Sequence, residues 1–421
     1  MLLKYLALLR YNHALARLSA VQLICYFGAW FSHTGIFTLL IELKAPVWAL
    51  SAAAMMAFLP SIVLAPFNGI IIDKLPKRTL MLALMLTEAI SVLALLLIDS
   101  LDFLWLLMML IFIRMGVGTL FFQTEMSLLP SLLAKRHLII ANEIHSMIFA
   151  FSYTAGMGLA GIFVHFYGIK ASFLFDFVLY CVGIFILFGT RFREPALQNA
   201  ATGALKMFTQ TFYYIKSKPV ILHLIFLHAL VGLFAYDTIV ALLVDYEYKG
   251  ILSVALAIGF LNTARAFALC VGPVLLSRFV SEKNMIYFLA FQGFCIMLWA
   301  CLESNFYTSL LGIFLAAFFC NSIWSYTFTR LQSACDSAFY GRIVAYNDMV
   351  FFIIASLVAS GVGLAFELGF SLPVITGFIG VLFILGSFYY AWVRRRYVEK
   401  DINGSKVILS NFAFDIQNIS L

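Results

Sequence analysis

Charged residues are scarce in this chain. Asp, Glu, Lys and Arg make up 11% of its 421 residues, whereas 64% are hydrophobic and 44 are Phe. Water-soluble globular domains carry about 25% charged residues, so the composition excludes that class and indicates a chain that lies in a lipid bilayer. Because a helix needs roughly 20 apolar residues to cross the hydrocarbon core, the length allows about twelve spans and leaves no sizeable soluble domain.

Patterns typical of enzymes and metal sites are missing from the sequence. It has no carboxylate pair at catalytic spacing, no Cys and His cluster at metal-ligand spacing, and no phosphate-binding glycine loop with its lysine. The seven cysteines are an odd number and suggest no disulfide framework. The N-terminal residues do not read as a removable signal peptide. We therefore expect no enzyme activity, no metal and no cofactor.

The sequence does contain a series of long apolar runs bounded by charges or turn residues. They predict an all-α integral membrane protein with membrane-spanning helices at 18–40, 51–72, 79–98, 103–122, 144–166, 172–189, 221–243, 252–276, 285–302, 307–327, 344–366 and 372–393. A polar interval divides these twelve helices into two pseudo-symmetric halves of six. The expected parts are 1–189, a linker at 190–219, a second half at 220–396 and a tail at 397–421.

Lys and Arg are concentrated in one set of alternate loops, and this set includes both ends of the chain. The opposite loops are mostly acidic, with residues such as Asp99, Asp245 and Glu303. Short loops rich in Lys and Arg stay in the cytoplasm, so both termini are expected there. The formal net charge of +7 is spread over many loops rather than one patch, which argues against nucleic-acid binding.

One loop carries a recognisable pattern, Gly69-Ile70-Ile71-Ile72-Asp73-Lys74-Leu75-Pro76-Lys77-Arg78. Its glycine, the acid four residues later and the basic cluster resemble the loop between the second and third helices of the major facilitator superfamily. The resemblance implies a secondary transporter with parallel halves and a substrate site between them near the midplane. A weaker copy, which has lost the acid, follows the eighth span with Gly272-Pro273, Arg278 and Lys283.

Two further segments are similar to the bacterial exporter branch that includes the enterobactin exporter. They are Leu129-Pro130-Ser131-Leu132, which Ala141-Asn142 follows, and the stretch 341–345, Gly-Arg-Ile-Val-Ala. The chain departs from the family at Pro76, which replaces a glycine, and at 156–161, which lacks the proline of the antiporter motif. The resemblance implies proton-coupled export of a small amphipathic molecule, such as a siderophore or drug, across a bacterial inner membrane.

The loop motif predicts a latch between helices at one side of the membrane. Gly69 permits close helix approach, and Asp73 can accept hydrogen bonds from Arg78 or from the N–H groups that open the eleventh span. Lys74, Lys77 and Arg78 also fit a simpler role as topology anchors.

Ionisable residues inside the spans are the next candidates, because such residues usually face a partner or a water-filled cavity. Glu88 and Arg114 lie at similar depth and either neutralise each other or leave Arg114 facing substrate or coupling ion. Arg114 also begins a pattern that resembles the superfamily's fourth-span motif, which is associated with proton coupling. Asp237 and Arg265 form a second possible pair, with Asp237 as a protonation site or a structural partner. Asp176 is expected to be solvated.

The remaining candidates are polar residues without an obvious partner in the sequence. His33, His223 and His228 titrate near neutral pH, but no carboxylate stands at helical spacing to orient them. Gln22, Asn262 and Asn321 suit hydrogen bonds either to substrate or between helices.

These observations predict a monomeric secondary carrier whose partners are a small-molecule substrate, the lipid bilayer and a proton as coupling ion. Within the same fold, uptake and lysophospholipid transport are alternatives to export. A non-transporting membrane scaffold or receptor is the alternative from another class.

Overall fold

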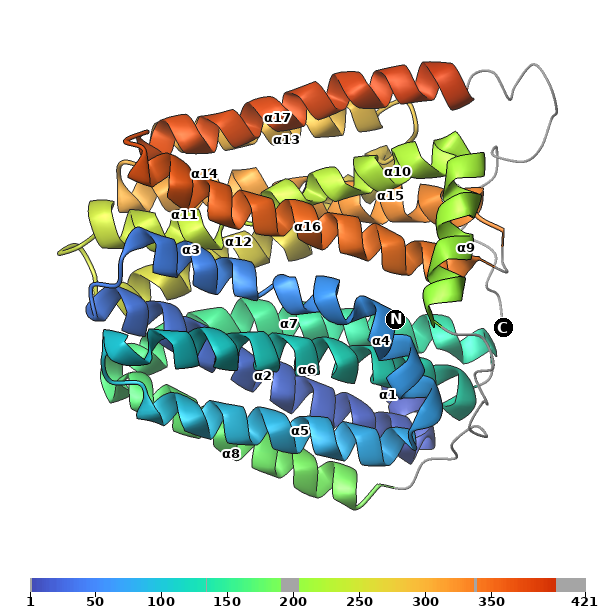
Figure 1. The fold of residues 1–421 in the computed structure, drawn as a ribbon, viewed down its shortest axis with the longest axis horizontal. Helices are drawn as coiled ribbons and strands as arrows, with labels where there is room; N and C mark the ends of the chain where they lie inside the picture. Colours follow the sequence, from blue (N-terminus) through green and yellow to red (C-terminus); the bar gives the residue numbers. More distant parts are fainter. Residues whose placement is uncertain (1, 134, 191–203, 337–338, 399–421) are drawn as a thin grey trace.

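The computed structural model describes residues 2–133, 135–190, 204–336 and 339–398. These residues are almost wholly helical and contain twelve segments that are long and apolar enough to cross a membrane. The segments run along one common axis (Figure 1). The prediction of an all-α membrane protein with twelve spans is confirmed. The predicted linker and tail fall partly outside the described residues, at 191–203 and 399–421.

The first six spans follow a short helix, α1 (Leu2–Tyr11). They are α2 (His13–Glu42), α3 (Val47–Met56) with α4 (Leu59–Lys74), α5 (Lys77–Ala94), α6 (Leu104–Leu132), α7 (Lys135–Tyr167) and α8 (Ile169–Phe188). The second span is thus two helices rather than the single one predicted. Pro60 explains the restart, because proline lacks an N–H group and is tolerated only in the first turn of a helix.

The second six spans begin after α9 (Ala204–Ser217). They are α10 (Pro219–Ala229) with α11 (Asp237–Leu242), α12 (Val254–Leu276), α13 (Met285–Leu302), α14 (Phe306–Phe318) with α15 (Cys320–Ala334), α16 (Tyr340–Glu367) and α17 (Leu372–Val393). The seventh span changes to a 3-10 turn at Leu230–Phe234, where Gly232 lies against α16: a Cβ there would be 2.8 Å from the Phe351 carbonyl oxygen. This interruption places Asp237 at the first residue of α11.

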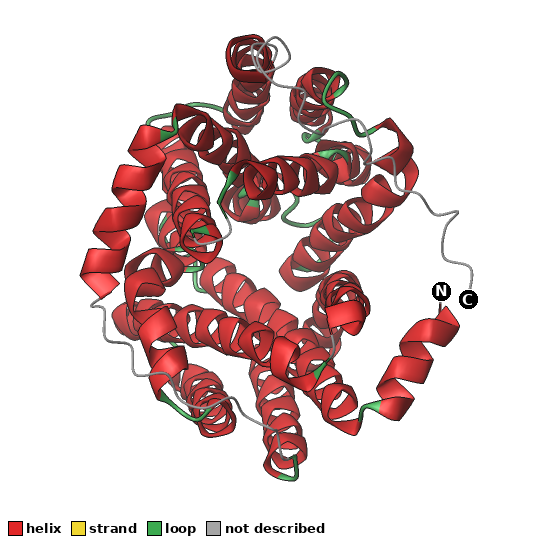
Figure 2. Cartoon of the chain, turned by 90° about the vertical axis from the view of Figure 1, so that its right-hand side faces the viewer, coloured by secondary structure: helices red, strands yellow, loops and turns green. Residues whose placement is uncertain are grey.

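Both ends of the described chain lie at one end of the bundle (Figure 1). We call this end, where α2 begins and α17 ends, the terminal face, and the other end the opposite face. Helix α9 lies across the terminal face (Figures 1 and 2). The Tyr214 ring stacks on Phe339 at 4.2 Å between centroids, and Lys218 Nζ lies 2.9 Å from Asp336. The hydrogen bonds that Lys218 donates to the Asp336 carboxylate lower the pKa of that group. These contacts attach α9, and Lys218 directly after it, to the turn between α15 and α16.

The two halves touch each other close to the opposite face. There α7 and α12 meet at two glycines, and a Cβ on Gly161 would lie 2.6 Å from the Ala255 carbonyl oxygen and 2.9 Å from Gly259 Cα. Nearby, the backbone N–H of Trp48, at the start of α3, donates to Glu367 Oε1 at the end of α16 (3.0 Å). Helices α7 and α12 can pack so closely because neither Gly161 nor Gly259 carries a side chain.

Candidate functional site

Three charged side chains meet inside the first half. Arg114 of α6 lies between two carboxylates, with Nε 3.2 Å from Glu88 Oε2 on α5 and Nη2 3.0 Å from Asp176 Oδ2 on α8. The Ser32 hydroxyl of α2 also donates to Asp176. All three charged residues are buried. One cation therefore serves two carboxylates in a medium where an unpaired charge is strongly unfavourable.

The structure brings Glu88 and Arg114 together as the sequence suggested, but it contradicts the expectation for Asp176. That residue is fully buried rather than solvated, with 0% of its surface exposed. The reason lies on α2, where Gly28 faces the carboxylate: a Cβ on Gly28 would lie 2.6 Å from Asp176 Oδ1. The missing side chain gives the carboxylate room to point inward toward Arg114.

A second cluster lies where the halves adjoin. Asp237 Oδ1 accepts a hydrogen bond from Arg265 Nη2 of α12 (2.8 Å), so the pair considered from the sequence is present. The same oxygen lies 3.9 Å from His33 Nε2 of α2, which belongs to the first half. Aromatic rings surround the cluster, with Arg265 Cζ 5.8 Å from the centre of the Tyr153 ring and Trp30 packed edge-on to His33. Asp237 is thus placed to interact with a permanent cation and with a titratable ring.

Comparison with known proteins identifies the family. The model of the Major Facilitator Superfamily matches residues 18–360. The chain belongs to this superfamily. The chain is therefore a member of a family of secondary transporters and not of an enzyme family.

The matched relatives show the fold of this chain and do not determine its substrate. The chain is 26% identical over 221 residues to the uncharacterized MFS-type transporter YfiS of Bacillus subtilis strain 168, a match that covers 51% of this chain and 52% of YfiS. A mutant of the nucleoside transporter NupG superposes with a TM-score of 0.72 at 11% identity, over 91% of this chain and 99% of that one. The POT family transporter PepTSo gives 0.71 at 12% identity, over 93% and 99%.

The predicted latch of this superfamily member is only partly described. Gly69 and Asp73 lie in α4, but their side-chain surroundings fall outside the described part of the structure. Lys74 is exposed, whereas Lys77 is buried with Nζ 3.4 Å from the Ile72 carbonyl oxygen. Arg78 donates to the carbonyl oxygen of Phe188 at the end of α8 and lies over that residue's ring. Lys77 and Arg78 thus contribute to packing in the first half, and a role for Asp73 stays a prediction.

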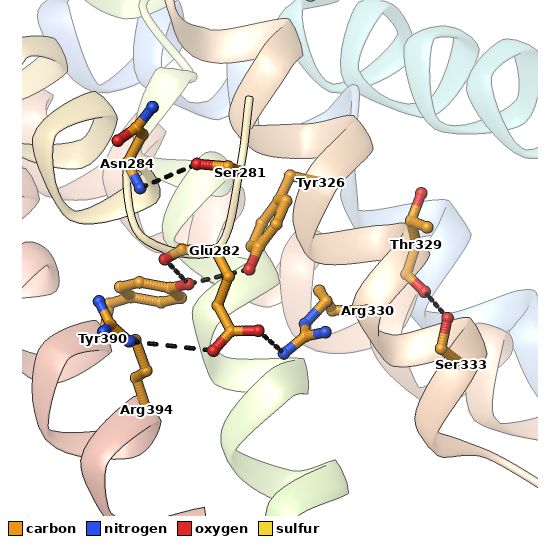
Figure 3. Close-up of polar contacts among 9 residues, drawn as sticks. All are labelled: Ser281, Glu282, Asn284, Tyr326, Thr329, Arg330, Ser333, Tyr390 and Arg394. Atoms are coloured by element: carbon orange, nitrogen blue, oxygen red, sulfur yellow. Dashed lines mark hydrogen bonds and ion pairs between the residues drawn. The ribbon is translucent and has the colours of Figure 1, made fainter. Parts of the chain in front are cut away.

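The corresponding loop of the second half contains a carboxylate that the motif comparison overlooked (Figure 3). Glu282 Oε2 accepts from Arg330 Nη2 of α15 (2.8 Å), and Oε1 lies 3.9 Å from Arg394 Nε just beyond α17. The Tyr390 hydroxyl donates to the Glu282 carbonyl oxygen (2.8 Å) and lies 2.9 Å from the Tyr326 hydroxyl. The copy has no acid at the position of Asp73, but Glu282 supplies one a few residues later.

The remaining polar candidates contact other helices. His228 is buried with Nδ1 2.9 Å from Thr327 Oγ1, and the Asn321 amide donates to the Leu269 carbonyl oxygen (3.1 Å). The Gln22 amide contacts the His145 ring. Asn262 is buried, and its Oδ1 has no hydrogen-bond partner among the described residues. Most of these candidate side chains are therefore already engaged in contacts between helices, with Thr327, Leu269 and His145 as their partners.

Sequence reasoning missed two buried acids, Glu125 and Glu303, and one partly buried acid, Asp348. The predicted fourth span ends at Phe122 and excludes Glu125, although α6 continues to Leu132. Asp348 lies inside the predicted span at 344–366 and Glu303 lies in a predicted loop, so neither is among the candidate site residues. Glu125 and Glu303 are 2% and 1% exposed. The sequence contains a sign of these acids, because each stands beside a long apolar run, where an ionisable residue is a candidate for a functional site.

Proposed function

We propose that this transporter exports a small amphipathic molecule in exchange for protons by alternating access. The observation that carries the proposal is the shared carboxylate of Asp237, which binds Arg265 in its own half and faces His33 across the boundary between halves. A proton on His33 converts this contact into an ion pair, whereas neutral His33 leaves Asp237 to Arg265 alone. Protonation therefore favours one arrangement of the halves over the other.

The Arg114 cluster supports proton coupling in a different way. One guanidinium contacts both Glu88 and Asp176, so the ionised cluster holds one more negative charge than positive charge. A buried site with excess carboxylate is suited to take up a proton. We assign it the role of a second protonation site within the first half.

Orientation and location extend the proposal. The terminal face holds the Lys and Arg residues of the basic loops, which supports its assignment to the cytoplasm. We propose a bacterial inner membrane, cytoplasmic termini, a monomer, and halves at 1–189 and 220–396 joined by the linker. Asp73 would latch α4 to the start of α16 at this face. The segments at 129–132 and 341–345 support export, and hence an exporter-like branch.

The proposal is tested with purified protein in liposomes that carry an imposed pH gradient and a panel of amphipathic substrates. Export by exchange predicts that substrate moves against the proton flow and that dissipating the gradient abolishes uphill movement. Asp237→Asn should lose the coupling, while His165→Gln, a change at an exposed histidine near the end of α7, should retain it. Movement with the protons would indicate uptake instead. No coupled movement of any substrate would overturn the proposal.

A further inference from the structure

Glu125 of α6 is a buried carboxylate that neither charged cluster uses. Its side chain is 2% exposed, and Oε2 has no hydrogen-bond partner among the described residues. The ion pairs of the described residues likewise include none with Glu125. Burying an ionised carboxylate without a hydrogen bond or a cation is strongly unfavourable. The group therefore holds a proton or receives a cation from outside the protein.

A connected group of polar and aromatic side chains from α2, α6 and α7 begins on the face of α6 that carries Glu125. Phe122 stands three residues before Glu125 and so shares its face of α6, and the His145 ring lies 5.1 Å from Phe122. The Gln22 amide contacts His145, and the Tyr26 ring lies 6.2 Å from the same imidazole. These five residues together supply one acid, one amide, one imidazole and two aromatic rings.

An aromatic path connects this group with the cluster at the boundary of the halves. The Phe149 ring lies 6.1 Å from Tyr26 and 6.2 Å from Tyr153, and Tyr153 lies 4.4 Å from Trp30. Phe149 is 49% exposed. Phe149 shares a face of α7 with Tyr153, and Arg265 Cζ of α12 lies 5.8 Å from the centre of the Tyr153 ring, so this face is turned toward the other half. The path therefore follows the surface that lies between the halves.

The depth of the group indicates how it is reached. Glu125 stands seven residues before Leu132, the last residue of α6, which corresponds to about 10 Å from the terminal face at 1.5 Å per residue. The closest contacts between the halves, at Gly161 and Gly259, lie near the opposite face. A ligand that enters from the terminal face would meet Glu125 before it meets Asp237.

We propose that Glu125, with Gln22, Tyr26 and His145, binds a cationic group of the transported molecule, such as a substituted ammonium. The carboxylate supplies the missing counter-charge, and the rings of Tyr26 and Phe122 favour an organic cation through cation–π contact. A metal ion is disfavoured, because the described residues contain no group of three His, Cys, Asp or Glu side chains that could hold one. The inference rests on the proposed transport function and specifies the class of its substrate.

The test measures equilibrium binding to the full-length protein in lipid nanodiscs. The probes are tetraphenylphosphonium, a lipophilic cation, and triphenylphosphine oxide, a neutral aromatic molecule. We expect the cation to bind at least tenfold more tightly than the neutral probe in the unmodified protein. Equal affinity for the two probes would overturn the proposal without any variant being needed.

The matched variants are Glu125→Gln and Glu143→Gln. Glu143 is an exposed carboxylate of α7 that accepts a hydrogen bond from Tyr5, so its neutralisation controls for the loss of one negative charge. We expect cation affinity to fall at least tenfold in Glu125→Gln alone, at an unchanged melting temperature. Retained affinity in a folded Glu125→Gln protein would show that Glu125 is a proton site or a neutral acid. Because binding requires no pH gradient, this result is independent of whether coupled export is observed.

Discussion

His33 Nε2 and Asp237 Oδ1 lie 3.9 Å apart although the two residues belong to opposite halves of the transporter. Because Arg265 holds the carboxylate in place from its own half, any separation of the halves at this level must pull His33 away from a fixed partner. The Arg114 cluster has no such property, since all its members lie in the first half. Proton binding at His33 can therefore act directly on the relative position of the halves.

Replacing His33 should remove this pH response. In a cysteine-free background, spin labels at Glu42→Cys and Leu368→Cys report the separation of the halves at the opposite face by electron paramagnetic resonance. We expect the short-distance population to increase from about pH 8 to about pH 5, because a histidine gains its proton in that range. His33→Gln should show no such change, and the exposed His165→Gln should behave like the unmodified protein. A pH response that persists in His33→Gln would exclude His33 as the sensor.

Removing Arg114 should destabilise the first half more than removing either of its partners. Arg114→Gln leaves two buried carboxylates without a cation, a loss of about 3–5 kcal/mol in the free energy of unfolding. Asp176→Asn keeps the contact between Arg114 and Glu88, so its effect should be clearly smaller. Thermal unfolding in detergent measures both. Adding Glu88→Gln and Asp176→Asn to Arg114→Gln should restore part of the stability, and failure to do so would mean that the charges are not coupled.

The sequence was sufficient for features that depend on local composition. Twelve spans, the asymmetry of the basic loops and the pairing of Asp237 with Arg265 all follow from apolar length and from the high energy of isolated charges in a bilayer. The interruptions of the second, seventh and tenth spans were not predicted. Each depends on a specific local cause, such as Pro60 at the start of α4 or the contact of Gly232 with α16.

The contacts that sequence reasoning missed join helices whose relative rotation no linear pattern reveals. His33 has no carboxylate at helical spacing, because its partner Asp237 comes from the other half of the chain. Asp176 was expected to face solvent, because the room that Gly28 gives it on α2 is visible only in three dimensions. Glu282 was missed for a similar reason, since it occupies a different loop position from Asp73.

The latch hypothesis for Asp73 is tested by neutralising its charge. Asp73→Asn should lower the transport rate while leaving the amount of protein in the membrane near normal, because the change removes a negative charge at a helix end and keeps the size of the side chain. Asp102→Asn, in the exposed turn before α6, is the matched control. Transport at the full rate in Asp73→Asn would rule out the latch.

Glu282 should stabilise the terminal face of the second half. Its neutralisation in Glu282→Gln weakens contacts to Arg330 and Arg394, and we expect a loss of about 1 kcal/mol because the group is only partly buried. Lys283→Gln changes the charge of the adjacent exposed residue and should have less effect. Thermal unfolding distinguishes the two. Combining Glu282→Arg with Arg330→Glu should recover stability relative to either single reversal, and no recovery would argue against a direct ion pair.

The glycine contact between α7 and α12 should control closure at the opposite face. A Cβ on Gly259 would lie 2.9 Å from Gly161 Cα and 3.1 Å from the Met157 carbonyl oxygen. Gly259→Val places a branched side chain where only backbone atoms fit, so the two helices must separate. In a cysteine-free background with Asn262→Cys, one turn further along α12, a membrane-impermeant thiol reagent measures the opening.

We expect Gly259→Val to increase the modification rate at position 262 at least several-fold when the reagent is added at the opposite face. Gly361→Val on α16 provides the control, because a Cβ at Gly361 meets no atom within 4 Å. It introduces the same side chain into a helix of the second half without a steric conflict, so its rate should match that of the parent. An equal rate in the two variants would show that the halves can close without the Gly161 contact, and the opposite-face closure would then depend on other contacts such as that between α3 and α16.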